Sequence, residues 1–243
     1  MIAKNHPASR IRRNGVSSAE IERAIHLDVE GFLDVDNGSP PVMASVLVDG
    51  RTETVVFEDQ SSALAETARA TGLRTVLLGP WLRDLLDRAV AESRWIAAYS
   101  RRERIVFEAC GIEGDEIALR YLDTRPLAIA WRRTRHPEVD RAVKARRRRR
   151  RERGEFDRGR ENSLPAIASL AGIETPPMYG AGRVTARLRA VIGQIHGRGS
   201  FEAITPTAKA KWANLVRHNR WDCEASKRLA LFAVEAEQNE PRR

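Results

Sequence analysis

The sequence has few cysteines, few lysines and no long apolar run. Its two cysteines, Cys110 and Cys223, lie far apart and form no CxxC pair, which argues against a disulfide framework or a cysteine zinc site. No segment approaches the roughly 18 apolar residues of a membrane span, and the first residues, MIAKNHPASRIRRNGV, contain no apolar core of a secretory signal. We therefore expect a cytoplasmic protein with no membrane partner and no small-molecule cofactor.

The positive charge of the chain is concentrated in one segment. The 243 residues carry a net charge of +9, and only five of the 42 basic residues are lysines. Between Asp140 and Arg160, 11 basic residues stand against four acidic ones, a net charge of +7 for that window. Because this segment has almost no apolar residues to bury, it is expected to form a solvated helix or a mobile arm.

The hydrophobic pattern predicts an α/β domain with three layers and a mixed sheet. The strand-like stretch 25–33 opens an antiparallel meander whose second and third strands are joined by the hairpin signal DGR. Helices and strands then alternate, which is typical of helices packed on both faces of a sheet. After the meander we expect helices at 61–72, 80–93 and 101–111, strands at 94–100 and from 117, and helices at 163–174, 182–199 and 206–237. The domain is expected to span 24–237 with a basic insertion at 132–162, a polar tail at 1–23 and a C-terminal tail at 238–243.

Two carboxylates share one face of the first predicted strand. Asp28 and Glu30 are two residues apart, which places their side chains on the same side at about 6.6 Å. Ionised carboxylates held this close repel each other unless a cation intervenes, and hard divalent cations prefer oxygen ligands. The alternative is that both side chains simply face solvent.

A second pair of candidate site residues is predicted on the last helix. His218 and Asp222 are four residues apart and so lie one turn apart on one helix face. A carboxylate and an imidazole in this position suit a metal ligand and a general base, although a surface pair of little energetic value has the same spacing. Glu103 follows a predicted strand that ends at Ser100, and an acid in a first helical turn is also favoured by the helix dipole.

Three short motifs together resemble the DEDD 3′–5′ exonucleases of the RNase H-like fold, closest to the predicted RecB-family, RNase H-like nuclease branch. They are HLDVEGF, AYSRRE and RHNRWDCEA, and the resemblance spans about residues 24 to 230. It implies an RNase H-like three-layer fold in which Asp28, Glu30, Glu103 and Asp222 bind two Mg²⁺ or Mn²⁺ ions. His218 would then orient or deprotonate the water that hydrolyses a phosphodiester bond of single-stranded DNA or RNA.

The chain departs from that family pattern in its second and third motifs. It has Ser100 and Glu103 where most such exonucleases have Asn and Asp, and His218 stands at the spacing of the subfamily that uses Tyr. Asp123, in YLDTRP, is either a further acid near the end of the sheet or a turn former. Whether Glu103 or Asp123 serves as the middle acid stays open at this point.

The arginine-rich segment is a candidate surface for nucleic acid. Arginine binds phosphate bidentately, and a run of arginines gives salt-dependent affinity without sequence preference. Trp221 is a candidate for stacking on a base, although a core or rim position is the more frequent one. The arginines concerned are Arg146, Arg147, Arg148, Arg149, Arg150 and Arg151.

Other functions are compatible with the same residues. The segment could instead be a solvated linker or bind acidic proteins or ribosomal RNA, and the protein could be a catalytically weak binding module on the same fold. A transposase or resolvase is disfavoured because such enzymes lack the helical His218–Asp222 pair.

Overall fold

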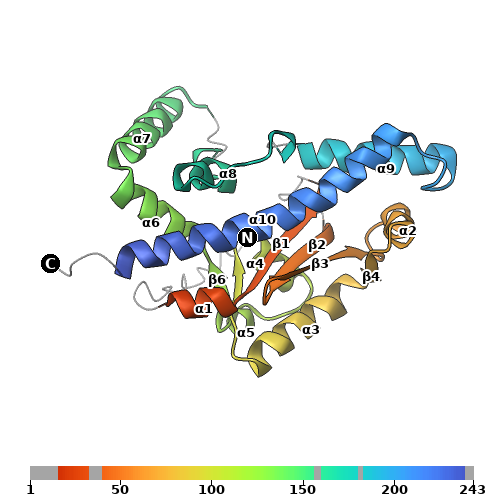
Figure 1. The fold of residues 1–243 in the computed structure, drawn as a ribbon, viewed down its shortest axis with the longest axis horizontal. Coiled ribbons are helices and arrows are strands. Elements are labelled where there is room, and N and C mark those ends of the chain that lie inside the picture. The colour runs from red at the N-terminus through yellow and green to blue at the C-terminus, as the bar shows by residue number, and fades with distance from the viewer. Residues whose placement is uncertain (1–15, 33–39, 156–159, 180–182, 239–243) are drawn as a thin grey trace, which may run out of the picture.

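The computed structural model describes residues 16–32, 40–155, 160–179 and 183–238. Its elements are a six-stranded sheet and helices that together make an α/β fold (Figure 1). The strands are β1 Ile25–Gly31, β2 Pro41–Val48, β3 Arg51–Phe57, β4 Arg74–Val76, β5 Ile96–Ala98 and β6 Tyr121–Asp123. The α-helices are α1 Ser18–Arg23, α2 Ser62–Ala70, α3 Leu78–Ala91, α4 Arg102–Ala109, α5 Gly114–Ala118, α6 Arg125–Arg135, α7 Pro137–Glu152, α8 Leu164–Ala168, α9 Arg183–Arg198 and α10 Pro206–Gln238. Short 3₁₀ turns lie at η2 Arg160–Asn162, η3 Ser169–Ala171 and η4 Pro177–Tyr179.

The sheet is mixed, with the strand order β4-β3-β2-β1-β5-β6. The antiparallel meander β1-β2-β3 predicted from sequence is confirmed, and β5 and β6 continue the sheet parallel to β1 on its other side. The β2–β3 turn has positive φ at both Asp49 and Gly50, as the predicted hairpin turn requires.

Helices cover both faces of the sheet. One face of the meander packs on α3, α4 and α5 through a core that includes Leu27, Val55 and Leu82. The other face packs on α2, α9 and α10 through residues such as Met43 and Trp212. Figure 1 shows the long helix α10 crossing the sheet, with α3 on the other side. No helix in the described part of the chain is both long and apolar enough to cross a bilayer.

Several sequence-based boundaries were wrong for identifiable reasons. The edge strand β4 has only three residues, too few for an alternating pattern to be recognised, and residues 18–23 form α1 where a polar tail was expected. The strand predicted from 117 is only β6, because α5 precedes it and Pro126 starts α6 directly after it. Leu33 lies outside the described residues.

The late helices also differ from their predicted extents. The helix predicted at 163–174 is the short α8, which begins after Ser163 and passes into η3. The helix predicted at 206–237 is the uninterrupted helix α10.

The arginine-rich segment forms the helix α7, which lies at the periphery of the molecule (Figure 1). Its start is fixed by Asp140, whose carboxylate accepts from Arg132 of α6 at 3.0 Å and pairs with Lys144 at 2.8 Å. Arg132 also donates to the carbonyl of Glu161, and Arg150 pairs with the carboxylate of that residue at 2.8 Å. Residues 137–152 thus take the helical form, the first of the two predicted, with one end of the helix docked on α6.

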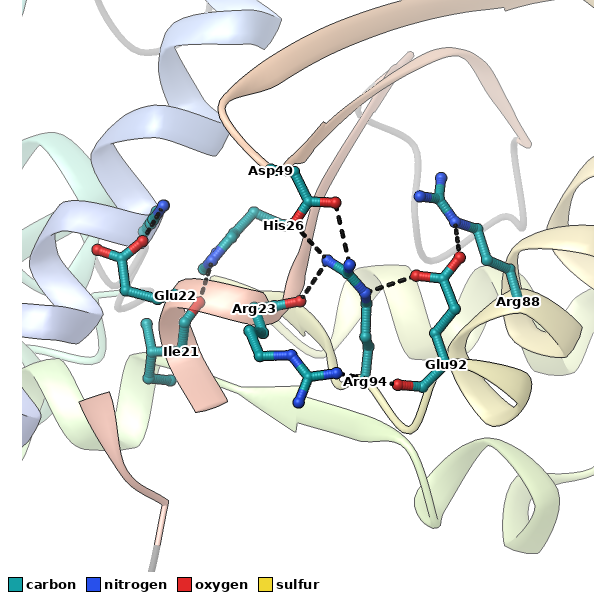
Figure 2. A network of polar contacts seen from close by, with 9 residues as sticks. Ile21, Glu22, Arg23, His26, Asp49, Arg88, Glu92 and Arg94 are labelled. Atoms are coloured by element: carbon teal, nitrogen blue, oxygen red, sulfur yellow. Dashed lines mark hydrogen bonds and ion pairs between the residues drawn. The ribbon is translucent and has the colours of Figure 1, made fainter. Parts of the chain in front are cut away.

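A second polar network joins the end of α1 to the β2–β3 turn and to the end of α3 (Figure 2). Arg94 donates to both oxygens of Asp49, at 2.8 and 3.0 Å, and to the carbonyl of Arg23 at 2.9 Å. Its Nε also lies 2.6 Å from the carboxylate of Glu92. Arg94 therefore connects the end of α1, the β2–β3 turn and the end of α3 near the start of β1.

Replacing Arg94 should weaken this junction. We expect Arg94→Met to lower the free energy of unfolding by about 1–2 kcal/mol, because a bidentate charge-assisted pair and a bond to a carbonyl are lost together. Arg88→Met, which removes only an exposed pair with Glu92 one helical turn away, should cost a small fraction of that. Urea unfolding of the two variants beside the wild type measures the difference, and equal effects would contradict this role of Arg94.

Candidate metal centre

The sheet brings acidic residues together because three of its strands are parallel. The carboxyl ends of β1, β5 and β6 share one edge of the sheet, the edge at which open α/β sheets place their ligand sites. Glu30 lies near the end of β1, Glu103 follows β5 in the first turn of α4, and Asp123 ends β6.

Helix α10 completes the site by packing on the polar face of β1. Asn219, which is fully buried, donates from Nδ2 to the carbonyl of Asp28 at 3.1 Å and also to its carboxylate. One turn along the helix, the Sγ of Cys223 donates to the carbonyl of Ser45 in β2 at 3.2 Å. These contacts fix the rotation of α10, so that His218 and Asp222 face the end of β1.

The structure groups Glu30, His218 and Asp222 as potential metal ligands. One ligand atom from each lies within 4.8 Å of the others. The Nε2 of His218 is 3.4 Å from Oδ2 of Asp222, so the predicted one-turn pair is formed. His218, predicted from the resemblance as the group that acts on water, thus stands among the candidate ligands.

The other two predicted ligands, Asp28 and Glu103, lie outside that group of three but interact with it electrostatically. The carboxylate of Asp28 is held by Asn219, as described above. Glu103 is buried, and its Oε2 accepts from the hydroxyl of Ser100 at 2.8 Å and from that of Tyr121 at 3.5 Å. Both carboxylates therefore have protein partners that orient them toward the cluster.

Burial and mutual repulsion raise the pKa values of these acids. Burial raises the pKa of Asp222 well above its usual range, and the charges of Glu30 and Glu103 add to the rise. The pKa of Asp28 is raised in the same way, by burial and then by Asp222, Glu30 and Glu103, against the opposing bond from Asn219. Burial raises the pKa of Glu30 to about 7, although Arg102 and Arg187 act in the opposite direction.

His218 is held neutral beside these acids. Burial lowers its pKa to about 4, and the positive charge of Arg187 contributes. The ring of Tyr179, from η4, stacks on the imidazole at a centroid distance of 5.0 Å and an interplanar angle of 7°. Among the described residues, the Nδ1 of His218 has no hydrogen-bond partner. A neutral, covered imidazole can bind a metal or accept a proton.

The remaining predicted residues take different positions. Asp123 is buried and accepts from the backbone N–H of Arg125 at 3.0 Å, which is the turn-forming role, while its charge also raises the pKa of Glu103. Trp221 is partly buried beside α8 and lies 6.0 Å from the ring of Tyr179. The six arginines lie on α7, away from the acidic group: Arg147 and Arg150 are partly buried, and Arg146, Arg148, Arg149 and Arg151 are exposed.

Sequence reasoning missed four residues that shape the site: Asn219, Tyr179, Tyr121 and Arg187. Asn219 had a usable signal, because it falls in the buried stripe of the last helix, where an amide needs a polar partner. The others come from segments whose approach to β1 depends on tertiary packing alone. Tyr179, for example, comes from the short turn η4.

The donor set fits a divalent cation of the harder kind. The carboxylates of Glu30 and Asp222 offer oxygen ligands, which suit Mg²⁺ and Mn²⁺, and the neutral imidazole of His218 favours Mn²⁺ of the two. Burial first, and then the neighbouring acids, raise the pKa values of Asp28 and Asp222, and a bound cation would favour their ionised forms.

The raised pKa of Glu30 predicts how stability depends on pH without metal. Below pH 4.5 the residue is protonated in both states, and as the pH rises through about 7 the unfolded chain ionises first, so stability is lost over this window. Between pH 4 and pH 8 the wild type should therefore lose about 3 kcal/mol relative to Glu30→Gln. Urea unfolding of both proteins in EDTA measures it, and a difference that does not vary with pH would contradict it.

Comparisons of the chain with protein-family models, with curated proteins and with solved structures give no match. The function is therefore argued from the geometry of the acidic group itself. That geometry joins carboxylates of the first strand to an imidazole and a carboxylate of the last helix.

Proposed function

We propose that the protein is a divalent-metal-dependent nuclease, a 3′–5′ exonuclease of DEDD type that hydrolyses single-stranded DNA or RNA. The observation that carries this proposal is the meeting of Glu30 with His218 and Asp222 within 4.8 Å. These three residues belong to two of the three motifs on which the resemblance rests. Glu103, of the remaining motif AYSRRE, is close enough to raise the pKa of both Glu30 and Asp222.

The sheet supports the finer assignment to an RNase H-like fold. An antiparallel meander comes first, further strands are added parallel to β1, and helices cover both faces. This is the arrangement expected from the resemblance, with β4 as an additional edge strand. The acids stand on the central strand β1 and at the ends of its parallel neighbours.

Each residue of the cluster has a defined role in this proposal. Glu30, Asp28, Glu103 and Asp222 would hold two Mg²⁺ or Mn²⁺ ions, which when bound supply an activated water and stabilise the leaving oxygen. His218, neutral near pH 7, accepts the proton of the attacking water. Asn219 fixes the position of Asp28, and Ser100 and Tyr121 fix that of Glu103.

Helix α7 is proposed to bind the nucleic acid backbone. Its exposed arginines can contact phosphates without rearrangement, whereas Arg150 already pairs with Glu161. The pair between Arg148 and Glu152 is exposed and of little energetic value, so it does not prevent binding to phosphate.

A catalytically weak binding module is the second candidate. The observation that favours it is that the exposed arginines are on α7, while the acids lie at the edge of the sheet, so affinity need not depend on the metal centre. The two candidates differ in turnover and in their dependence on Mn²⁺.

The nuclease proposal predicts metal-dependent cleavage that requires the cluster. We expect the purified protein to degrade a 3′-labelled single-stranded oligonucleotide with Mn²⁺ and not with EDTA. His218→Ala should reduce the rate roughly 100-fold, because it removes the group that accepts the proton, and Asp222→Asn should abolish metal binding and cleavage. Asp84→Asn, on the exposed side of α3, is the matched control and should leave the rate unchanged. A wild type that binds oligonucleotide but never cleaves it would favour the binding module.

The arginine helix predicts salt-dependent binding. Replacing Arg146 and Arg149 with Gln should weaken binding of a single-stranded oligonucleotide and reduce the slope of log K against log salt by roughly 0.7 per arginine. Fluorescence anisotropy in EDTA at several KCl concentrations measures this, with Arg51→Gln, an exposed residue at the start of β3, as a control. An unchanged slope would exclude α7 from the binding surface.

A further inference from the structure

Two arginine side chains lie beside Glu30 without forming an ion pair to it. Arg187 belongs to α9, which packs against β1, and Arg102 belongs to the first turn of α4. Within the described part of the chain, no salt bridge joins either guanidinium to a carboxylate, although both lower the pKa of Glu30. They are therefore near the acidic group but do not direct their hydrogen bonds at it.

Arg187 is the more confined of the two. Its side chain is only 7% exposed, and its Nη2 donates to the carbonyl of Met178, next to the Tyr179 ring that covers His218. Its Nη1 is buried and has no hydrogen-bond partner among the described residues. Its helix packs against β1, and its positive charge lowers the pKa values of both Glu30 and His218, so the group lies near the candidate metal centre.

Arg102 approaches the same place from the other side. Its Nη2 lies 3.3 Å from the point that a Cβ on Gly31 would occupy, directly after Glu30 on β1. This nitrogen is also buried without a partner among the residues that the structure describes. Because Gly31 has no Cβ, Arg102 can approach the backbone this closely. A Cβ at Gly31 would also meet the Cα of Pro41 at 3.0 Å.

Unpartnered buried guanidinium nitrogens are costly and call for an explanation. A buried donor that loses its water without gaining a partner costs about 1–3 kcal/mol, and more when it is charged. The carboxylates nearby are the natural partners, yet the two arginines leave them free. A phosphate accepts bidentate bonds from guanidinium groups and would supply the missing acceptor.

We propose that Arg187, assisted by Arg102, forms a phosphate-binding site beside Glu30, which receives a phosphate of the nucleic acid next to the metal centre. This inference rests on the proposed function and adds a residue set that the three motifs do not contain. Cations held by the carboxylates would leave the two guanidinium groups to neutralise the phosphate, in which charge develops during hydrolysis. The rival explanation is that the arginines are only counter-ions of Glu30.

The two explanations differ in the effect on phosphate binding that they predict for variants of Arg187. The experiment is calorimetric titration of Mn²⁺ into the protein, followed by titration of the nucleoside monophosphate dTMP into the Mn²⁺-loaded protein. We expect Arg187→Met to weaken dTMP binding roughly 10-fold or more while Mn²⁺ affinity is kept or increased. Arg187→Lys, which keeps the charge but lacks the planar fork, should restore part of the affinity, and Arg102→Met should weaken binding in the same direction.

A matched control on the same helix separates a specific effect of Arg187 from a general effect of removing an arginine. Arg189→Met changes an exposed arginine of the same helix and should alter neither titration, and thermal unfolding shows that each variant is folded. Unchanged dTMP binding in both Arg187 variants, with tighter Mn²⁺ binding, would identify a counter-ion and overturn the phosphate site. If the wild type takes up no Mn²⁺, the proposed nuclease function is lost. The phosphate site is then tested separately by titrating dTMP into the metal-free protein. Binding of dTMP that does not depend on Arg187 would overturn the phosphate site.

Discussion

The packing of α10 across β1 requires the polar face of β1 to find polar partners on the helix. Asp28 and Glu30 point to this face and lose most of their contact with water when the helix covers them. Asn219 donates hydrogen bonds to the carbonyl and the carboxylate of Asp28. His218 and Asp222 lie next to Asn219 on the same side of α10. The candidate site is thus part of a polar strip in this interface, which also includes the contacts of Arg220 with Thr54 and of Cys223 with Ser45.

This interface carries an electrostatic cost that the protein alone only partly compensates. The carboxylates raise one another's pKa values, and the nearest cations, Arg102 and Arg187, influence Glu30 without bonding to it. An apolar pair of faces would avoid this cost entirely, as the core on the other side of the sheet does. This electrostatic cost arises at the edge of the sheet where the parallel strands end. Ligand binding explains it more readily than folding does.

Much of this arrangement was accessible from sequence, because it follows from local periodicity. The alternation of β1 placed Asp28 and Glu30 on one face, and the helical spacing placed His218 one turn from Asp222. The meander followed from its DGR turn.

What sequence could not supply was the approach of segments that are distant in the chain. The stacking of Tyr179 on His218, the bonds of Tyr121 and the position of Arg187 depend on how η4, β6 and α9 pack. The docking of α7 was likewise hidden, since its fixed point is a buried Arg132–Asp140 pair within an apparently solvated segment.

The continuity of α10 links the two surfaces to which function is assigned. The same helix that presents His218 and Asp222 to β1 continues into the apolar contacts of Ala225 and Leu229 with α6 and α8. Helix α6 in turn holds α7 through Arg132, so the arginine helix has a fixed orientation relative to the acidic group. A break in α10 between these points would uncouple them without removing any acid or any arginine. The single uninterrupted helix α10 therefore fixes the orientation of α7 relative to the acidic group, as the proposed binding of one nucleic acid strand by both surfaces would require.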